Sequence, residues 1–210
     1  PADSVITIKM DSGWPKVGYK SFVSNTLPQD EWFSLSVPVN DFNATPGDQP
    51  LNTSSVINIF VAEFSAAAHG MFDNIQLVCG HKDMDGCGIN PPEVEIKGEQ
   101  IVVYDDAANT DVWTNGIGAW DTVTGSDYFD GATSNHVQWS EVDSDDAERG
   151  KVLQINFGTG GADGLLYIQS GQPVNLSDFA GGALIFDVKV LDYADTTAGL
   201  SYKIDCIFPC

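Results

Sequence analysis

The two ends of this chain carry the same short strand sequence, and this repetition constrains its organisation more than any other feature. Residues 6–11 read Ile-Thr-Ile-Lys-Met-Asp, and residues 200–205 read Leu-Ser-Tyr-Lys-Ile-Asp. An aromatic residue and a proline follow each segment, and the two copies are offset by 194 residues. Repetition at a fixed offset is typical of a repeated unit. We therefore expect the chain to begin inside one copy of such a unit and to end inside the next.

The charge of the chain excludes several classes of partner. With 9 basic and 30 acidic residues among 210, the formal net charge is −21. Nucleic-acid binding depends on Lys and Arg that neutralise phosphates, so we predict no nucleic-acid partner, and anionic membranes and polysaccharides are disfavoured for the same reason. The sequence holds no run of 18 apolar residues, so no membrane span is predicted. The net charge is therefore compatible with a neutral or a cationic partner.

Short alternations of apolar and polar residues, separated by Gly, Asp, Asn and Pro, dominate the sequence and predict an all-β protein. In residues 32–39 the alternation places Phe33, Leu35 and Val37 on one face, and Pro38 indicates an edge strand or a strand end. Many short strands of this kind favour a sandwich or a barrel. We predict strands near residues 5–10, 32–39, 56–64, 71–78, 94–104, 136–142, 151–157, 164–169, 183–191 and 200–206.

A segment rich in Gly, Asp and Pro divides the chain. We interpret residues 80–97 as a linker between a first part, 1–79, and a second part, 98–210. Neither part holds enough strands for a complete sandwich. Either the two parts close into one sandwich, or the chain belongs to a tandem array whose halves are completed by other chains through domain swapping. A single sandwich is favoured, because each half alone would expose an unpaired sheet edge.

Several segments are similar to jelly-roll modules. Residues 72–77 (Phe-Asp-Asn-Ile-Gln-Leu) resemble the closing strand of such modules, and residues 32–42 resemble their "W-x-x-V-x-V-P-L-x-D-F" strand and turn. Residues 102–106 resemble an opening strand, and residues 174–190 resemble the middle loop and long core strand. Together these segments resemble the non-catalytic β-sandwich modules of glycoside hydrolases, such as exo-glucanases and agarases, of marine bacteria. Since the closing half precedes the opening half here, the resemblance implies a jelly-roll-like β-sandwich in circularly permuted order.

The resemblance also implies a function. It predicts a non-catalytic carbohydrate-binding module of a secreted bacterial enzyme that degrades a neutral polysaccharide of the β-glucan or agar type. Modules of this kind often hold a structural calcium ion between their first and last strands. By position, Asp73 would supply one carboxylate from the last strand, and Asp105 or Asp106 another from the first. Calcium takes six to eight oxygen ligands, so further ligands would be needed.

The candidate sugar-binding residues are tryptophans in a glycine-rich context. Trp113 and Trp120 flank a stretch with three intervening glycines or alanines, Asp121 follows directly, and Trp139 stands in an alternating segment. Glycines around a tryptophan favour a loop, where an indole can stack on a sugar ring while polar groups bind its hydroxyls. The alternative is that these tryptophans pack in the core. The remaining two tryptophans, in strand-like contexts, are expected to pack: Trp14 and Trp32.

Four cysteines form two close pairs along the sequence, Cys79 with Cys87 and Cys206 with Cys210. The residues that align with Cys206 and Cys210 in the first copy of the repeat are both different, which favours a disulfide between these two. Cys79–Cys87 is then the second predicted disulfide. Paired cysteines favour an oxidising compartment. Four free thiols in a cytosolic protein remain the alternative.

No catalytic constellation is recognisable. The histidines are isolated, the glutamates stand in no catalytic strand motif, and we predict a non-catalytic protein. Two other hypotheses remain: a structural spacer or self-associating β-sandwich without a glycan ligand, and a small β-sandwich lyase or hydrolase. Burial of all three of Trp113, Trp120 and Trp139 would favour the spacer.

Overall fold

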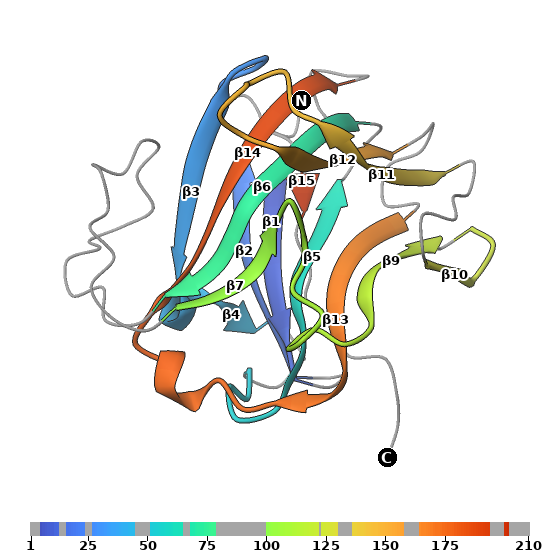
Figure 1. Ribbon diagram of the computed structural model, residues 1–210. Helices are drawn as coiled ribbons and strands as arrows, with labels where there is room; N and C mark the ends of the chain where they lie inside the picture. Colours follow the sequence, from blue (N-terminus) through green and yellow to red (C-terminus); the bar gives the residue numbers. More distant parts are fainter. Residues whose placement is uncertain are drawn as a thin grey trace.

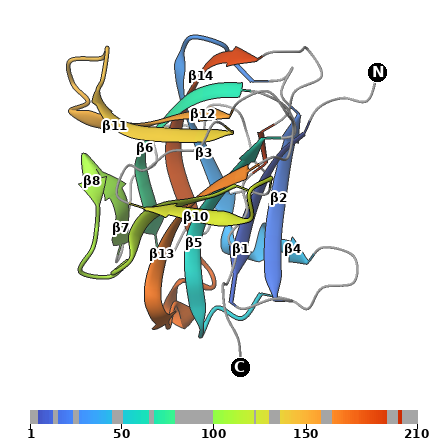
Figure 2. The same cartoon turned by 90° about the vertical axis from the view of Figure 1, so that its right-hand side faces the viewer.

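Two antiparallel β-sheets pack face to face and form an all-β sandwich (Figures 1 and 2). The computed structural model describes residues 5–12, 16–23, 27–44, 51–64, 68–78, 100–121, 123–129, 136–157, 164–193 and 200–201. The predicted fold class is therefore confirmed at the level of a β-sandwich. Circular permutation stays a prediction.

The first sheet is eight-stranded and has the order β1-β2-β15-β5-β13-β9-β10, with β4 paired to β2 and β1 also paired to β5. Its strands are β1 (Val5–Asp11), β2 (Val17–Val23), β4 (Asn43–Ala44), β5 (Val56–Phe64), β9 (Gly116–Asp121), β10 (Ser126–Phe129), β13 (Gly164–Val174) and β15 (Leu200–Ser201).

The second sheet is seven-stranded and has the order β11-β12-β6-β14-β3, with β7 paired to β6 and β8 paired to β7. Its strands are β3 (Trp32–Pro38), β6 (Ala68–Val78), β7 (Gln100–Asp105), β8 (Ala107–Ala108), β11 (Val137–Asp143), β12 (Lys151–Phe157) and β14 (Ala183–Tyr193). Two short 3-10 helices complete the described elements: η2 (Val39–Asp41) and η3 (Ser177–Phe179).

Strands from the two parts of the chain pair with each other in both sheets. In the first sheet β5 pairs with β13, and in the second sheet β6 lies between β12 and β14. The segments on either side of the predicted linker therefore contribute to the same two layers. The linker itself, residues 80–97, lies outside the described residues.

The core lies between the sheets and follows from the alternation within strands. On β3, Phe33, Leu35 and Val37 point inward and are buried. Three phenylalanines join the two layers: Phe60 of the first sheet meets Phe72 and Phe186 of the second at ring-centroid distances of 5.5 and 5.4 Å, in edge-to-face geometry. Such aromatic pairs add to the stabilisation that comes from apolar burial.

Most predicted strands are confirmed, with several differences, among them the short strands β4, β8 and β10, which were not predicted. The segment Gly116–Asp121, expected to be a loop, is strand β9, paired with β13 on one side and β10 on the other. The strand Val17–Val23 was not predicted. Pro38 is the last residue of β3, at the edge of its sheet, as its lack of a backbone donor requires.

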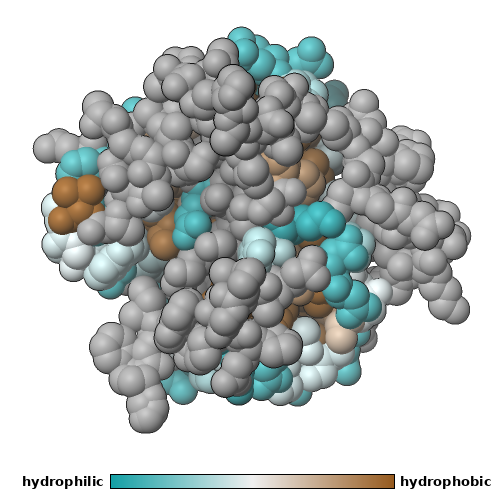
Figure 3. All heavy atoms as spheres, turned by 180° about the vertical axis from the view of Figure 1, so that it is seen from behind, coloured by the Kyte–Doolittle hydropathy of each residue, from teal (hydrophilic) through white to brown (hydrophobic). Residues whose placement is uncertain are grey.

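Other predictions fall outside the described part of the chain. The four cysteines, Cys79, Cys87, Cys206 and Cys210, all lie there, so both disulfides stay predictions. Among the described residues, no helix is long and apolar enough to cross a membrane. The same residues expose one large apolar side chain strongly, Val123 at 59%, and the side of the molecule in Figure 3 presents both hydrophilic and hydrophobic groups.

Candidate functional site

The outer face of the second sheet carries most of the polar side chains that strand register brings together. Successive residues of a strand point to opposite faces of the sheet. Residues that share a face with the buried phenylalanines therefore point into the core, and the residues between them point outward. Register across β11, β12 and β6 aligns Gln138 with Asn156 and Asn156 with His69. Two residues before Asn156 on β12, Gln154 lies opposite Met71 of β6.

We call the side chains Gln138, Asn156, His69 and Gln154 the neutral strip. Gln138 and Asn156 are exposed, and His69 and Gln154 are partly exposed. A hydrogen bond of 2.7 Å links the Gln154 amide nitrogen to Nε2 of His69. Amide and imidazole groups offer both donors and acceptors without a permanent charge. The four side chains of the strip are therefore uncharged on a strongly acidic protein, and register places Asp192 of β14 opposite His69 at the end of the row.

A charge cluster lies on the same face, further along β6 and β14. Asp73 and Asp187 stand directly opposite each other on these strands, where two carboxylates would repel. Arg149 resolves this conflict, because its Nη1 donates to Oδ2 of Asp187 at 2.6 Å and to Oδ2 of Asp73 at 3.1 Å. The guanidinium also lies 4.4 Å from the ring centroid of Trp32, a cation–π contact.

Neutral hydrogen bonds complete the environment of Asp187. The amide of Asn74 donates to Oδ2 at 2.8 Å, and the hydroxyl of Ser34 donates to Oδ1. Asn74 adopts a φ of 48°, at a point where the register between β6 and β14 shifts. Asn tolerates this left-handed conformation better than most residues. The resulting bulge lets both Asp73 and Asn74 face Asp187.

Burial and charge act in opposite directions on this cluster. Burial raises the pKa of Asp73 above its ordinary value, although the backbone N–H of Asn74 and the Arg149 guanidinium act to lower it. Burial also disfavours the charged form of Arg149, but the carboxylates of Asp187 and Asp73 outweigh it and raise the pKa of Arg149. The cluster is thus an ion pair that depends on all three partners.

The loop that supplies Arg149 crosses this face and is fixed at several points. Lys189 of β14 donates to Oδ2 of Asp145 at 2.5 Å, and this hydrogen bond lowers the pKa of Asp145. The Nε of Arg149 lies 3.3 Å from Oδ2 of Asp146 within the loop. These contacts attach residues 144–150 to β6, the neighbour of β12, and to β14, one strand further from the hairpin to which the loop belongs.

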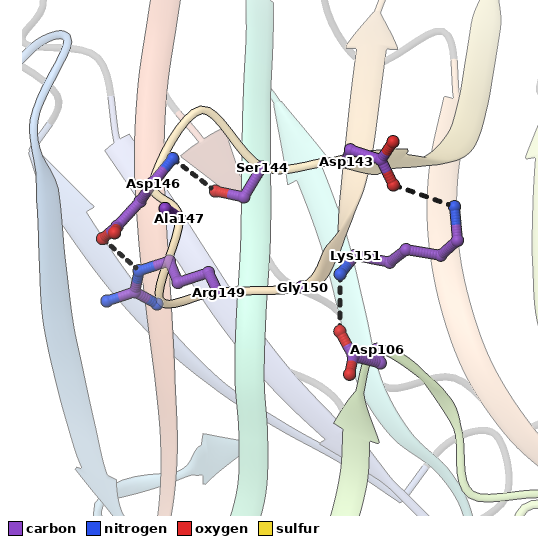
Figure 4. A pocket seen from close by; sticks show the side chains of 8 residues that line it. All are labelled: Asp106, Asp143, Ser144, Asp146, Ala147, Arg149, Gly150 and Lys151. Atoms are coloured by element: carbon purple, nitrogen blue, oxygen red, sulfur yellow. Dashed lines mark hydrogen bonds and ion pairs between the residues drawn. The ribbon is translucent and has the colours of Figure 1, made fainter.

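An open hollow of about 410 Å³ borders this loop (Figure 4). One wall comes from the turn after β7, where the Asp106 carboxylate accepts a hydrogen bond of 2.5 Å from the backbone N–H of Lys151. On the opposite wall the Lys151 ammonium lies 3.2 Å from Asp143. The lining residues are Asp106, Asp143, Ser144, Asp146, Ala147, Arg149, Gly150 and Lys151.

The candidate tryptophans do not gather at one surface. Trp113 is fully buried and Trp139 is 8% exposed, and both belong to the core. Trp120 is partly exposed and packs against the same core from β9 of the first sheet. Trp113 and Trp139 therefore have no ring face free for a sugar, and Trp120 is the one candidate indole that reaches solvent.

Asp121 is fully buried and has a local structural role. Its Oδ1 accepts hydrogen bonds from the backbone N–H groups of Val123 and Thr124 at 2.8 and 3.1 Å. Its Oδ2 lies 2.8 Å from Nδ1 of His136. The carboxylate thus closes the turn between β9 and β10 and holds the start of β11, so it is not available to sugar hydroxyls.

Two of the predicted calcium ligands are engaged in other contacts. Asp73 is committed to Arg149, whose guanidinium occupies the place of a counter-cation, and Asp106 accepts from the Lys151 backbone. Asp105 is exposed at the end of β7. Within the described ranges, no group of three His, Cys, Asp or Glu side chains is placed to hold a metal ion. Asp73 with Arg149 therefore does not fit a calcium ion.

Comparison with protein-family models, with curated proteins and with solved structures found no match to this chain. Fold and surface together define the class as an antiparallel β-sandwich with a polar outer face.

Proposed function

We propose that this protein is a non-catalytic carbohydrate-binding module of a secreted bacterial enzyme that degrades a neutral polysaccharide of the β-glucan or agar type. The observation that carries the proposal is the neutral strip on the outer face of the second sheet, where register aligns Gln138, Asn156 and His69 across three strands. The resemblance of residues 32–42 and 72–77 to jelly-roll modules supports the same class of ligand.

The chemistry of the strip suits sugar hydroxyls. Neighbouring strands lie about 4.8 Å apart, so three aligned side chains extend over roughly 10 Å, which is comparable to two linked sugar rings. An amide can donate to one hydroxyl and accept from the next. Because Gln138 and Asn156 are uncharged, binding desolvates no ion, which keeps the cost of removing water low.

Three carboxylates on this face each contact a cation, which favours a neutral ligand. Asp73 and Asp187 are paired with Arg149, and Asp145 with Lys189. The remaining acidic surface contributes to a net charge of −21, and such a field repels anionic polysaccharides. Neutral glycans experience no such repulsion.

Hydrogen bonds to sugar hydroxyls are the main contribution to glycan binding in this proposal. The Trp32 ring has Arg149 over one face, and Trp120 belongs to the other sheet. Stacking by a tryptophan therefore supplements the strip only if a long polysaccharide reaches around to Trp120.

Retention on insoluble glycans tests the proposal. We expect the protein to co-sediment with insoluble β-glucan or agarose, and Gln138→Ala combined with Asn156→Ala to reduce retention at least fivefold. The matched control is Gln172→Ala, an exposed glutamine at the end of β13 in the other sheet, which should leave retention unchanged. Absence of retention on every neutral glycan, with the protein folded, would contradict the function.

The resemblance to jelly-roll modules is the only support for calcium in this proposal. Because Asp73 is paired with Arg149, any ion would have to use other carboxylates, among which Asp105 and Asp106 remain. Calorimetric titration of the chelator-treated protein with calcium measures this directly. A protein that binds glycan without binding calcium would remove the ion from the proposal and leave the glycan site intact.

One observation favours a structural spacer as the second candidate function. Trp113 and Trp139 are core residues, as expected for a module that uses its tryptophans to pack. A folded protein with no retention on neutral glycans, and with measurable self-association, would support this alternative.

A further inference from the structure

Two members of the neutral strip, His69 and Gln154, are joined by a hydrogen bond between β6 and β12. A distance of 2.7 Å separates Nε2 of Gln154 from Nε2 of His69. Gln154 lies opposite Met71, and His69 is the outward-facing residue before Met71 on β6. The contact therefore runs diagonally across the strand pair, which long side chains can span. Both side chains are partly exposed, so the contact lies where a ligand can meet it.

The atoms in this contact determine where the imidazole proton is. An amide nitrogen donates hydrogen bonds and does not accept them, so Nε2 of His69 is the acceptor. A neutral imidazole that accepts at Nε2 carries its proton on Nδ1. Because the Gln154 nitrogen is turned toward the ring, its Oε1 is on the side away from His69. The arrangement therefore presents Gln154 to a ligand as an acceptor.

A second proton on the His69 ring would reverse this contact. Both ring nitrogens of an imidazolium donate, so Nε2–H of His69 would meet the amide N–H groups of Gln154, and two donors would oppose each other. The last torsion of a glutamine side chain is broad and roughly two-fold, so a half-turn of the amide relieves the conflict. Oε1 then accepts from His69, and the amide nitrogen takes its place toward the ligand.

Charged residues of both signs surround His69. Register places Asp192 of β14 opposite His69, and Lys189 of β14 opposite Met71, with the Lys189 ammonium already in an ion pair. Further along β6, Asp73 belongs to the charge cluster. The β12 side chains beside His69 are both amides. Among these residue types, histidine is the one that ordinarily changes charge between pH 5 and 8.

We propose that His69 is a positioning residue of the glycan site: the neutral ring holds the Gln154 amide with Oε1 presented to a sugar hydroxyl, and the protonated ring reverses the amide. The ligand in this inference rests on the proposed function, but the orientation of the amide can be measured without a ligand. A hydroxyl that donates to Oε1 loses its acceptor when the amide turns. Glycan binding should therefore weaken as the pH falls through the titration of His69.

NMR spectroscopy of the protein without glycan tests the positioning role directly. We expect His69 to carry its proton on Nδ1 at pH 8, and the side-chain amide signals of Gln154 to move together with the His69 titration as the pH falls to 5. His69→Gln is the matched variant, because its oxygen can accept from Gln154 and does not titrate. A proton on Nε2 of His69 at pH 8, or Gln154 signals that move equally in His69→Gln, would overturn the proposal.

Retention on insoluble β-glucan or agarose measures the consequence for binding. Retention of the unaltered protein should fall about fivefold between pH 8 and pH 5, the ordinary weight of one hydrogen bond. His69→Gln and Gln154→Met should both lose this pH dependence, the first because the amide no longer turns and the second because no amide is present. A fall of the same size in either variant would overturn the positioning role. Absence of retention at every pH would contradict the proposed function instead, and the NMR titration would still decide whether His69 positions Gln154.

Discussion

Arg149 donates a hydrogen bond of 2.6 Å to Asp187, and this ion pair joins the loop between β11 and β12 to the middle of the second sheet. The same nitrogen contacts Asp73 at 3.1 Å. All three side chains are largely buried, so none of the charges is well solvated in the absence of the others. A buried pair adds little net stability compared with apolar residues, but removing one partner is costly.

Arg149→Met should destabilise the protein by about 3 kcal/mol, because two buried carboxylates lose their counter-cation. The cation–π contact with Trp32 is lost as well. Urea denaturation followed by tryptophan fluorescence measures the change in the free energy of unfolding. A loss below about 0.5 kcal/mol, the scale of an exposed ion pair, would contradict the structural role assigned to Arg149.

The triple variant Arg149→Met, Asp73→Asn and Asp187→Asn is the control for this prediction. With the carboxylates neutralised, the cost of removing the guanidinium should fall, and we expect the triple variant to be more stable than Arg149→Met alone. The stability changes caused by substitutions within one network are not additive. This non-additivity distinguishes lost charge compensation from lost packing.

The raised pKa of Asp73 predicts a pH dependence of stability. Burial is its main cause. Since an unfolded aspartate titrates at about 3.9, the folded state binds more protons than the unfolded state between that pH and the higher folded pKa. The stability contribution of Asp73 is therefore present below about pH 3.9 and is lost as the pH rises through the folded pKa.

Asp73→Asn removes this titration. We expect the free energy of unfolding of Asp73→Asn, minus that of the unaltered protein, to become more positive as pH rises from 3.5 upward, because the unaltered protein loses the contribution of protonated Asp73. Denaturation at a series of pH values measures the difference, and Asp111→Asn, at an exposed carboxyl, serves as control. A difference that stays constant with pH would contradict the raised pKa.

Alternation of apolar and polar residues was sufficient to predict much of the sandwich. Residues 32–38 alternate clearly and are strand β3, residues 56–64 form a largely apolar run and are strand β5, and residues 151–157 are strand β12. β9 escaped prediction because its glycines are typical of loops. Gly118 instead makes room for Tyr167, whose ring carbons and hydroxyl oxygen lie 2.5 to 2.8 Å from where a Cβ at this position would stand.

The polar face could not be predicted from local sequence. Trp32, Asp73 and Asp187 are far apart along the chain and are brought together by register between strands, and the loop between β11 and β12 adds Arg149 to them. The aligned residues Gln138, Asn156 and His69 depend in the same way on three strands. For the tryptophans, local sequence was a poor guide to exposure, because a glycine-rich context says little about whether an indole is buried.

Trp113 and Trp120 should respond differently to replacement by alanine. Trp113 is fully buried, so Trp113→Ala should cost about 3 to 5 kcal/mol of stability. Trp120→Ala should cost less, since this side chain is only partly buried. Thermal denaturation measures both, and glycan retention at a temperature where both variants are folded separates stability from binding. Equal losses of stability would contradict the different burial of the two indoles.

Gly118→Ala should destabilise the protein by about 1 to 3 kcal/mol, because an added methyl group overpacks the contact with Tyr167. The Tyr167 ring cannot withdraw easily, since it is fully buried and its hydroxyl donates a 2.7 Å hydrogen bond to Asp127 of β10. Burial and this hydrogen bond both raise the pKa of Tyr167.

Urea denaturation measures the cost of Gly118→Ala. Gly125→Ala is a glycine control, because its added Cβ meets no atom within 4 Å, although its φ of 64° adds backbone strain. The decisive comparison is Gly118→Ala in a Tyr167→Ala background, where the methyl group finds space and should cost less than 0.5 kcal/mol, the ordinary scale of a neutral substitution. If Gly118→Ala costs the same in both backgrounds, the close approach of β9 to Tyr167 is not what requires glycine there.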